Sequence, residues 1–327
     1  MIFSLTVKES VISELSCSDE YISGEALAEK LGVSRNTIWK AVKSLREEGF
    51  DIDASPNRGY RILKKPYIIT EAGIRKFLPH DDNRRLYILN SIDSTNNYAK
   101  ELARNGEPGG TVVISDMQTA GKGRMGRSFC SPPKSNIYMS IILRPEIDIE
   151  SSQLITSCVA AAAASAIDTI CGTDTQIKWV NDLFLNGKKI CGILTEASVS
   201  FESGTLDFAV VGIGINVRSV VNVFPEELLK TATSIQDETE KLFDRSEIIA
   251  EVITSVEKYL NELPDRKFLE EYKKRSFIIG KRVIVTKAGE EREAIAAGIS
   301  ENAGLEVIYD DGQKEALNSG EARILPT

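Results

Sequence analysis

The hydrophobic positions of the first 65 residues fall into three runs with helical spacing. Val7, Val11 and Leu15 recur every fourth position, which places them on one face of a helix. Ser23 and Ser34 stand directly before the second and third runs, and serine is a favoured N-cap residue. The pattern therefore predicts three short helices. The apolar stripe of the third helix, over 35–46, consists of Ile38, Ala41, Val42 and Leu45.

A hairpin is predicted after the third helix. Residues 49–54 and 60–63 have strand character, and residues 55–59 between them include proline, asparagine and glycine, which favour turns. Three helices followed by a hairpin are typical of a winged helix-turn-helix, and Leu31-Gly-Val-Ser-Arg35 suits the turn of such a motif. A small helical domain used for protein contact is the alternative.

From residue 86 the pattern changes to alternating strands and helices, which predicts a mixed α/β domain. Asn186-Gly187 between two apolar runs predicts a hairpin turn. Gly212 and Gly214 interrupt the last strand pattern, and glycine inside a strand suggests a ligand against the backbone. The predicted strands cover 86–89, 111–115, 136–143, a hairpin within 178–194, 206–211 and 213–217; helices are predicted from about Thr70 and over 98–104, 155–170, 246–263 and 268–275.

The end of the chain is predicted to be all-β. Strands at 282–286, 292–299, 305–309 and 315–317 are separated by turns that contain glycine. A module of this size, about fifty residues, resembles an SH3-like barrel. The fold class is therefore α+β multidomain, and Lys64-Lys-Pro66 marks the first boundary. We predict a winged helix-turn-helix at 1–65, a central mixed α/β domain at 66–275 and an SH3-like β-barrel at 276–327.

The charge distribution restricts where nucleic acid can bind. The chain has 327 residues and a net charge of −8, so it has no general attraction for DNA or for anionic membranes. Residues 34–46 nevertheless contain four cations and no acidic residue, which favours contact with a phosphate backbone. The predicted DNA-binding region is Gly24 to Lys43, especially Ser34, Arg35, Asn36, Thr37, Lys40 and Lys43, with Asn57 and Arg58 in the wing.

Cysteine and histidine usage argues against several classes of protein. The five cysteines are scattered without a Cys-x-x-Cys pair, which indicates reduced thiols in a cytoplasmic protein rather than a disulfide framework or a zinc site. The one histidine, His80, lies in a polar connector, so a histidine-rich metal site is excluded and any metal ligands stay unassigned. No apolar run is expected to reach the ~20 residues of a membrane span, and the segment at the start is too polar for a signal peptide.

The densest chemical signal is Gln118-Thr-Ala-Gly-Lys-Gly-Arg-Met-Gly-Arg-Ser-Phe129. Glycines let a ligand approach backbone N–H groups, and the neighbouring cations Lys122, Arg124 and Arg127 favour an anion such as phosphate. The loop is not a dinucleotide fingerprint, because Pro132-Pro133 prevents a helix from opening after it. It also lacks the Gly-Lys-Ser/Thr ending of a P-loop. The alternative is a flexible basic surface loop that binds no ligand.

Four motifs in this order give the chain its resemblance to a known family. They are Asp93-Ser-Thr-Asn96, the basic loop, Lys178-Trp-Val-Asn-Asp-Leu183 with Gly187-Lys-Lys-Ile-Cys-Gly-Ile-Leu194, and Gly212-Ile-Gly-Ile-Asn216. Over nearly its whole length the chain resembles the bifunctional biotin–protein ligases that also act as biotin operon repressors. The central domain is then expected to have the class II synthetase-like sheet of biotin and lipoate ligases. Two departures are Lys122, where the family usually has arginine, and Val180, where it usually has proline.

The resemblance implies a reaction in two steps. ATP activates biotin to biotinyl-5′-AMP, and a lysine of a carrier domain then attacks the adenylate. Lys189 is the implied contact to both the biotin carboxylate and the α-phosphate, Arg124 and Arg127 hold phosphate oxygens, and Asp182 orients or deprotonates the incoming lysine. The implied biotin-binding set is Ser94, Thr95, Asn96, Gln118, Lys122, Gly123, Arg124, Lys189, Gly192, Gly212 and Gly214. The implied adenylate-binding set is Arg124, Arg127, Phe129, Lys178, Asn181, Lys189 and Asn216.

The resemblance also implies partners. Mg²⁺ accompanies ATP, the biotin carboxyl carrier of acetyl-CoA carboxylase or a related carboxylase is the acceptor, and operator DNA binds the winged helix. A homodimer is expected when the adenylate is bound, and no membrane is involved. The alternatives are a lipoate-type ligase and a ligand-sensing winged-helix transcription factor without ligase activity.

Overall fold

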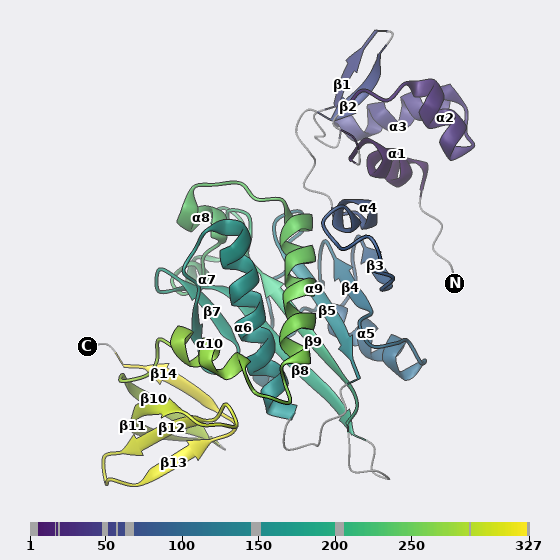
Figure 1. Cartoon of the computed structure of the whole chain (residues 1–327). Coiled ribbons are helices and arrows are strands. Elements are labelled where there is room, and N and C mark those ends of the chain that lie inside the picture. The colour runs from purple at the N-terminus through teal and green to yellow at the C-terminus, as the bar shows by residue number, and fades with distance from the viewer. Residues whose placement is uncertain are drawn as a thin grey trace. The chain divides into compact units, whose positions relative to one another are not determined.

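The computed structural model describes residues 6–16, 18, 20–47, 52–56, 58–62, 69–144, 152–199, 206–287 and 289–325. The chain divides into two compact units, Met1–Asp81 and Asp82–Thr327 (Figure 1). The predicted boundary at Lys64-Lys-Pro66 and the wing residue Asn57 lie outside the described residues. The predicted domain limits at 65 and 275 remain predictions.

The first unit has the elements that its hydrophobic pattern predicted. Helices α1 (Val7–Ser16), α2 (Gly24–Leu31) and α3 (Arg35–Glu47) precede the antiparallel strands β1 (Ile52–Ser55) and β2 (Gly59–Ile62), and α4 (Glu71–Arg75) follows. The hydroxyl oxygen of Ser23 accepts from the Ala26 N–H at 3.0 Å, and that of Ser34 accepts from the Thr37 N–H at 3.1 Å. Both predicted N-caps are therefore confirmed.

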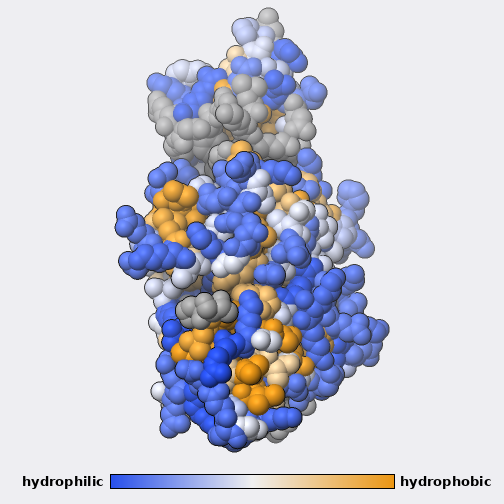
Figure 2. All heavy atoms as spheres, turned by 90° about the vertical axis from the view of Figure 1, so that its left-hand side faces the viewer, coloured by the Kyte–Doolittle hydropathy of each residue, from blue (hydrophilic) through white to orange (hydrophobic). Residues whose placement is uncertain are grey.

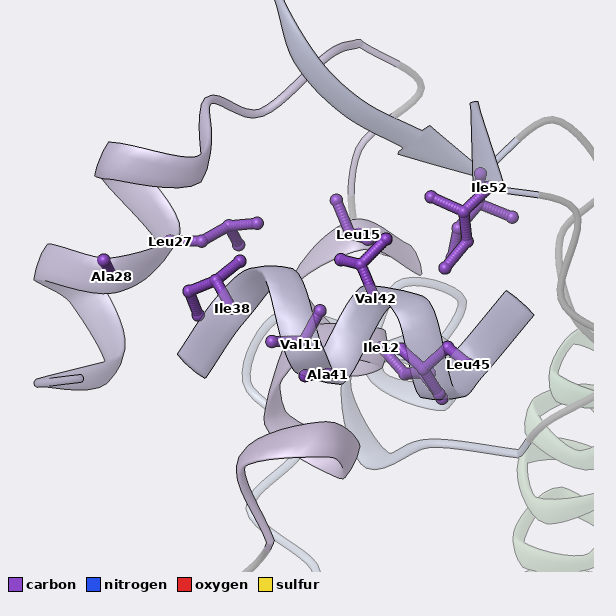
Figure 3. Packing of buried hydrophobic residues seen from close by; sticks show 11 residues of the cluster. Val11, Ile12, Leu15, Leu27, Ala28, Ile38, Ala41, Val42, Leu45 and Ile52 are labelled. Carbon is purple, nitrogen blue, oxygen red and sulfur yellow. The ribbon is translucent and has the colours of Figure 1, made fainter. Parts of the chain in front are cut away.

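Helices α1, α2 and α3 and the hairpin of this unit enclose one core (Figure 3). The predicted stripe of α3 points into it, and Ile38 and Leu45 have no exposed surface. Burying a side chain of this size contributes about 1.5–3 kcal/mol to folding. The other members of the core are Val11, Ile12 and Leu15 from α1, Leu27 and Ala28 from α2, and Ile52 and Ile62 from the hairpin.

The second unit is built on a seven-stranded sheet with the order β3-β4-β5-β9-β8-β7-β6. Strands β3 and β4 are parallel and the remaining neighbours are antiparallel. The turn Asn186-Gly187 joins β7 to β8 with φ of 49° and 81°, as a two-residue hairpin requires. The strands are β3 (Leu86–Leu89), β4 (Val112–Ser115), β5 (Ile137–Leu143), β6 (Gln176–Lys178), β7 (Asp182–Leu185), β8 (Lys188–Val199) and β9 (Leu206–Ile215).

Two strand predictions were wrong in detail. Gly212 and Gly214 do not interrupt β9, because the strand is paired on both sides and its ladder continues through both glycines to Ile215. The stretch before the hairpin turn is not one strand, since residues 179–181 separate β6 from β7. The peptide bond between Trp179 and Val180, where proline is usual in the family, is cis.

Helices cover the sheet. α6 (Ser152–Cys171) and α9 (Arg245–Asn261) lie side by side in front of it (Figure 1), and α10 (Phe268–Arg275) packs against α6. α5 begins at Thr95, three residues earlier than predicted, and ends at Arg104. It packs on β4, β5 and β9 through Ala99 and Ala103. The short helices α7 (Glu226–Leu229) and α8 (Ile235–Thr239) were not predicted.

The two faces of the sheet differ because strand residues alternate between them. On β8, Thr195 receives a 2.8 Å hydrogen bond from Thr156 of α6, whereas Glu196 accepts from Lys100 of α5 at 2.6 Å. The α5 face is apolar at one end, where Phe208 and Val210 of β9 pack under α5. Two and four residues further along the same strand face, the side chains are absent at Gly212 and Gly214. This change opens the α5 face to a ligand.

The expectation that no apolar run approaches the length of a membrane span was wrong. Within α6, Leu154–Cys171 is apolar and long enough by composition, but 72% of this window is buried inside the protein. Its alanine run, 160–164, is fully buried, and small side chains let the neighbouring elements approach closely. On the face shown in Figure 2, hydrophobic residues gather in patches that hydrophilic residues separate.

The C-terminal β domain is a five-stranded antiparallel sheet with the order β13-β12-β11-β10-β14. This order leaves β13 and β14 unpaired with each other, so the described strands do not close into a barrel by hydrogen bonds. β14 was not predicted. The strands are β10 (Arg282–Lys287), β11 (Glu290–Ile299), β12 (Leu305–Tyr309), β13 (Lys314–Leu317) and β14 (Glu321–Ile324).

Candidate active site

A cleft on the α5 face collects nearly all of the predicted site residues. It lies where β8 and β9 carry glycines, and the basic loop and the start of β14 complete its walls. The predicted residues that line it are Ser94, Thr95, Asn96, Gln118, Lys122, Gly123, Arg124, Arg127, Phe129, Lys178, Asn181, Asp182, Lys189, Gly192, Gly212 and Gly214.

One end of the cleft offers neutral polar groups. Ser94 stands at the N-cap position of α5, but its side chain makes no capping hydrogen bond, although the residue is only 1% exposed. The Gln118 amide oxygen accepts from the Thr95 N–H at 2.9 Å, and the Gln118 amide nitrogen donates to Ser131 Oγ at 2.9 Å. These contacts fix the amide orientation of Gln118. An uncharged polar ring is the ligand that such a set suits.

The floor of the cleft is bare backbone. Gly192 of β8 and Gly214 of β9 are paired in register, and the ring of Phe129 lies over both. A Cβ atom at Gly214 would stand 2.5 Å from that ring, so glycine is needed for this close approach. Phe129 also meets Tyr138 edge to face, with ring centroids 6.4 Å apart. The aromatic side chain of Phe129, a member of the implied adenylate-binding set, thus covers the floor of the cleft.

The basic loop is folded back on itself. The Gly123 N–H donates to the Arg127 carbonyl at 2.7 Å, and the Phe129 N–H donates to the Gly121 carbonyl at 2.8 Å. Met125 and Gly126 at its tip both have positive φ, which allows the tight reversal. The Lys122 ammonium donates to Asn97 Oδ1 at 2.7 Å, on the α5 side of the cleft.

Two arginines of this loop contact the C-terminal domain. Arg127 forms a bidentate pair with Glu321, with both N···O distances at 2.5 Å. Arg124 donates to the Gly320 carbonyl and to Asn181 Oδ1, each at 3.0 Å. Planar, bidentate contacts of this kind are the ones that arginine also makes with phosphate.

Lys189 and Asp182 form the charged pair at the centre of the cleft. Their Nζ and Oδ1 atoms are 2.7 Å apart across the β7–β8 hairpin, and both side chains keep about a quarter to a third of their surface exposed, 32% for Lys189 and 24% for Asp182. The end of the Lys189 side chain passes over the backbone of Gly192. Lys178 adds a further cation to the cleft, and burial lowers its pKa below the ordinary lysine value although Asp182 and Glu321 oppose that shift.

Three regions of the sequence match family models. Residues 8–61 match an HTH domain, residues 88–216 match the biotin/lipoate A/B protein ligase family, and residues 278–323 match the biotin protein ligase C terminal domain. The bifunctional ligase/repressor BirA of Bacillus subtilis strain 168 is 38% identical over 255 residues, which cover 77% of this chain and 78% of that protein.

The chain belongs to the biotin protein ligase family.

Other biotin protein ligases resemble it over larger parts of their length. The bifunctional ligase/repressor BirA of Escherichia coli strain K12 is 29% identical over 95% of both chains. The solved structure of the biotin protein ligase from Aquifex aeolicus in complex with biotin and ATP has a TM-score of 0.62 and 26% identity, covering 74% of this chain and 99% of that chain. The family that the four motifs indicated is therefore confirmed.

One predicted residue of this biotin protein ligase family member lies away from the cleft. Asn216 is 4% exposed, and its amide nitrogen donates to the Thr233 carbonyl at 2.9 Å. Its implied contact with the adenylate stays a prediction, and the structure does not bring Asn216 among the lining residues. Trp179 of the third motif lines the cleft and donates from Nε1 to the Ala303 carbonyl of the C-terminal domain at 3.0 Å.

Sequence reasoning missed the contribution of the last strand. Glu321 and Ala322 line the cleft, although they follow the last family motif by more than a hundred residues. A single acid beside a glycine carries no recognisable signal, and β14 has too few apolar positions to be predicted. The other lining residues outside the predicted set are Ser128, Tyr138, Met139, Trp179, Ile193, Leu194 and Ile213.

The candidate DNA interface lies on α3 and the wing of the first unit. Arg35, Asn36, Lys40 and Lys43 are exposed on α3. Thr37 is half-buried, and its hydroxyl lies 2.9 Å from the capping hydroxyl of Ser34. In the wing, the guanidinium of Arg58 stacks on Tyr21, 4.2 Å from the ring centroid. Trp39 was not in the predicted set, yet 52% of it is exposed between these cations.

Proposed function

We propose that this chain activates biotin with ATP to biotinyl-5′-AMP and transfers the biotinyl group to a lysine of the biotin carboxyl carrier of acetyl-CoA carboxylase or a related carboxylase. The observation that carries the proposal is the Lys189–Asp182 pair, set with Arg124 and Arg127 around a glycine floor. The first step joins two anions, and three cations around one cleft offset their repulsion. Family membership and the ligand-bound Aquifex aeolicus relative support it.

The first step needs a carboxylate oxygen to attack the α-phosphorus while pyrophosphate leaves. Lys189 is the cation best placed to hold both groups, because its ammonium lies in the cleft beside the floor. Arg127 can exchange Glu321 for phosphate oxygens, since it presents the same fork to either anion. Phe129 and the folded loop would then keep water from the mixed anhydride.

The second step forms an amide and releases AMP. The ε-amine of the carrier lysine attacks the acyl carbon, loses a proton and displaces the phosphate oxygen. Asp182 lies at the cleft in a charged pair with Lys189 and can orient the incoming amine or accept its proton. Lys178 and Asn181 would contact the adenylate from the same wall.

Mg²⁺ would accompany the nucleotide. Among the described residues, no group of three or more His, Cys, Asp or Glu side chains is arranged to hold a metal ion. The two acids at the cleft, Asp182 and Glu321, are paired with Lys189 and Arg127. The described part of the chain therefore offers no metal cage of its own, and we propose no step through the ion.

The direct test is incubation with biotin, ATP and a carrier domain, followed by mass spectrometry of the carrier. Addition of one biotinyl group to a lysine is the expected result. Lipoate in place of biotin tests the lipoate-type alternative, which the neutral set Ser94, Thr95 and Gln118 disfavours. An unlabelled carrier together with ligand-dependent DNA binding would favour the transcription factor without ligase activity.

We further propose that the protein represses transcription, with biotinyl-5′-AMP as corepressor. We also propose that the three domains span residues 1–65, 66–275 and 276–327, that the C-terminal strands form an SH3-like barrel, and that the protein is cytoplasmic. The support for repression is the confirmed helix-turn-helix match and the two ligase/repressor relatives. The barrel is supported by five antiparallel strands in the order β13-β12-β11-β10-β14.

A dimer is proposed for the adenylate-bound form, which would then bind operator DNA. One winged helix reads only half of a two-fold operator, and a second protomer supplies the other half. The proposed face includes β3, an edge strand that neighbours β4 and the basic loop that follows it. Sedimentation is expected to show a shift from monomer to dimer when biotin and ATP are added together; a monomer under both conditions would contradict it.

Trp39 is predicted to read base edges rather than phosphates. An exposed indole between cations suits apolar contact with thymine methyl groups in the major groove. Trp39→Ala is expected to weaken binding to the operator about tenfold without changing the salt dependence, whereas Lys40→Ala should reduce the salt slope by about one. Both can be measured by anisotropy titration at several salt concentrations. An equal loss of affinity for operator and for random DNA would show that Trp39 makes no sequence-specific contact.

A further inference from the structure

Asn96 connects the cleft to a carboxylate outside it. Its amide nitrogen donates to Glu196 Oε2 at 2.8 Å and to the Leu194 carbonyl at 3.3 Å. A backbone carbonyl and an ionised carboxylate can only accept hydrogen bonds. The side-chain nitrogen of Asn96 must therefore face both partners, and its side-chain oxygen must face the other way. Asn96 is 4% exposed and lines the cleft, whereas Glu196 is not among the lining residues.

Glu196 is held ionised. Lys100 of α5 pairs with its other oxygen at 2.6 Å, and the two side chains are 20% and 29% exposed. Burial raises the pKa of the Glu196 carboxyl, but hydrogen bonds from Lys100 and Asn96 outweigh burial and lower the pKa below its ordinary value. The negative charge therefore persists at neutral pH and keeps the Asn96 amide in one orientation.

The orientation of Asn96 determines the direction of the next hydrogen bond. Ser140 Oγ lies 2.7 Å from Asn96 Oδ1 and 2.8 Å from Thr95 Oγ1. A hydroxyl has one proton, and Asn96 Oδ1 has none, so the Ser140 proton must go to Asn96. Thr95 then receives no hydrogen bond from Ser140, and its own proton goes to Ser140 or to Gln118 Oε1, 3.1 Å away. The lone pairs of Thr95 remain open to a donor in the cleft.

Gly212 leaves the space that this arrangement needs. A Cβ atom at Gly212 would stand 2.2 Å from Asn96 Oδ1, so the amide oxygen lies directly against the backbone of β9. Any other residue would push Asn96 away from Ser140 and from Glu196. The glycine predicted as a ligand contact thus also makes room for the hydrogen-bonded chain behind the ligand.

We propose that Glu196 is a positioning residue that, through Asn96 and Ser140, sets the Thr95 hydroxyl to accept a hydrogen bond from a ring N–H of biotin. The ureido ring has two N–H donors, and lipoate has none. Glu196 would therefore help to select a ring with N–H groups without touching it. This inference rests on the proposed ligase function and deepens it.

A Glu196→Gln substitution separates this role from a merely structural one. Lys100 can only donate, so it draws the oxygen of the substituted amide to itself and turns the nitrogen of that amide toward Asn96. Asn96 must then flip, Ser140 donates to Thr95, and Thr95 loses acceptor capacity. Adding Lys100→Met removes the conflict, so that the oxygen of the substituted amide can again accept from Asn96. The double variant should recover although it has one ion pair fewer.

The experiment measures biotin-dependent pyrophosphate exchange and, without ATP, biotin affinity by calorimetry. For Glu196→Gln we expect the KM and Kd for biotin to rise about tenfold, with kcat unchanged, because one hydrogen bond to the ligand is lost. Wild-type protein should reject cyclic carbamate analogues, in which oxygen replaces one ring N–H, by at least about a hundredfold. The variant should discriminate less. Lys100→Met/Glu196→Gln should return both values to within about threefold of wild type.

Glu301→Gln is the matched control, because Glu301 is paired with Lys273 at 2.7 Å and neither residue lines the cleft. It should change neither affinity nor discrimination, and thermal unfolding of all variants shows whether each is folded. An unchanged biotin KM in Glu196→Gln, or a double variant no better than the single one, overturns the inference. A wild-type protein without biotin-dependent exchange overturns the proposed function instead, and the inference with it.

Discussion

Replacing Lys189 with alanine is expected to lower the rate of adenylate formation about 10²–10³-fold, the loss typical when one charge-stabilising group is removed from a transition state. The biotin carboxylate and the α-phosphate are both anionic, and Lys189 is the cation at the centre of the cleft, 2.7 Å from Asp182. Without it, the Asp182 carboxylate would lose its ion-pair partner and add a negative charge to the cleft, where the partly desolvated Lys178 is the neighbouring ammonium. Biotin-dependent exchange of pyrophosphate into ATP measures this step alone.

Lys188 provides the control for that substitution. It is the preceding residue in β8, it is exposed, and its ammonium donates to the Leu229 carbonyl at 3.4 Å instead of facing the cleft. Lys188→Ala should keep a normal exchange rate. If Lys189→Ala also exchanged pyrophosphate at a near-normal rate, Lys189 would have no part in activation.

The second large effect is expected at Asp182, in the transfer step. Asp182→Asn keeps the size of the side chain but can neither accept a proton nor attract an ammonium group. We expect transfer from preformed biotinyl-5′-AMP to the carrier lysine to fall about 10²-fold, at the lower end of the range for general-base catalysis. Single-turnover transfer, followed by mass spectrometry of the carrier, isolates this step from activation.

Asp207→Asn is a suitable comparison, since Asp207 forms a surface pair with Arg144 at 3.6 Å outside the lining of the cleft. Asp182 also pairs with Lys189, so pyrophosphate exchange should be followed in the same variant. A larger loss in transfer than in exchange supports a direct contact with the incoming amine. Equal losses in both steps would mean that Asp182 acts only by holding Lys189.

Much of the fold was predictable because its signals are local. The N-caps Ser23 and Ser34 and the Asn186-Gly187 turn each depend on a few adjacent residues, and each was found where it was predicted. The exact bounds of α10 could be predicted for the same reason, since apolar positions and charges alternate at helical spacing over Phe268–Arg275. The division between β6 and β7 escaped prediction because Asn181 is the one turn-favouring residue in 179–181, and the residues on either side continue a strand pattern.

Site residues that lie within the family motifs could be predicted, and site residues outside the motifs could not. Motifs identified Lys189, Asp182 and the basic loop, and the structure brings these into one cleft. They could not identify Glu196 or Glu321, because each acts through a partner that is distant in sequence. Nor could they show that Asn216 is buried with its amide bonded to Thr233, since burial depends on how α8 and β9 pack.

The pairing of Arg127 with Glu321 has a consequence for the effect of ionic strength. Salt weakens exposed ion pairs by screening, and it weakens both the pair with Glu321 and a contact with phosphate. When a nucleotide binds, Arg127 exchanges the Glu321 carboxylate for a phosphate group, whereas an unpaired arginine would lose bound water. The affinity for ATP should therefore depend on salt less steeply than three cations in one cleft would suggest, because the protein already supplies the counter-ion that the nucleotide displaces.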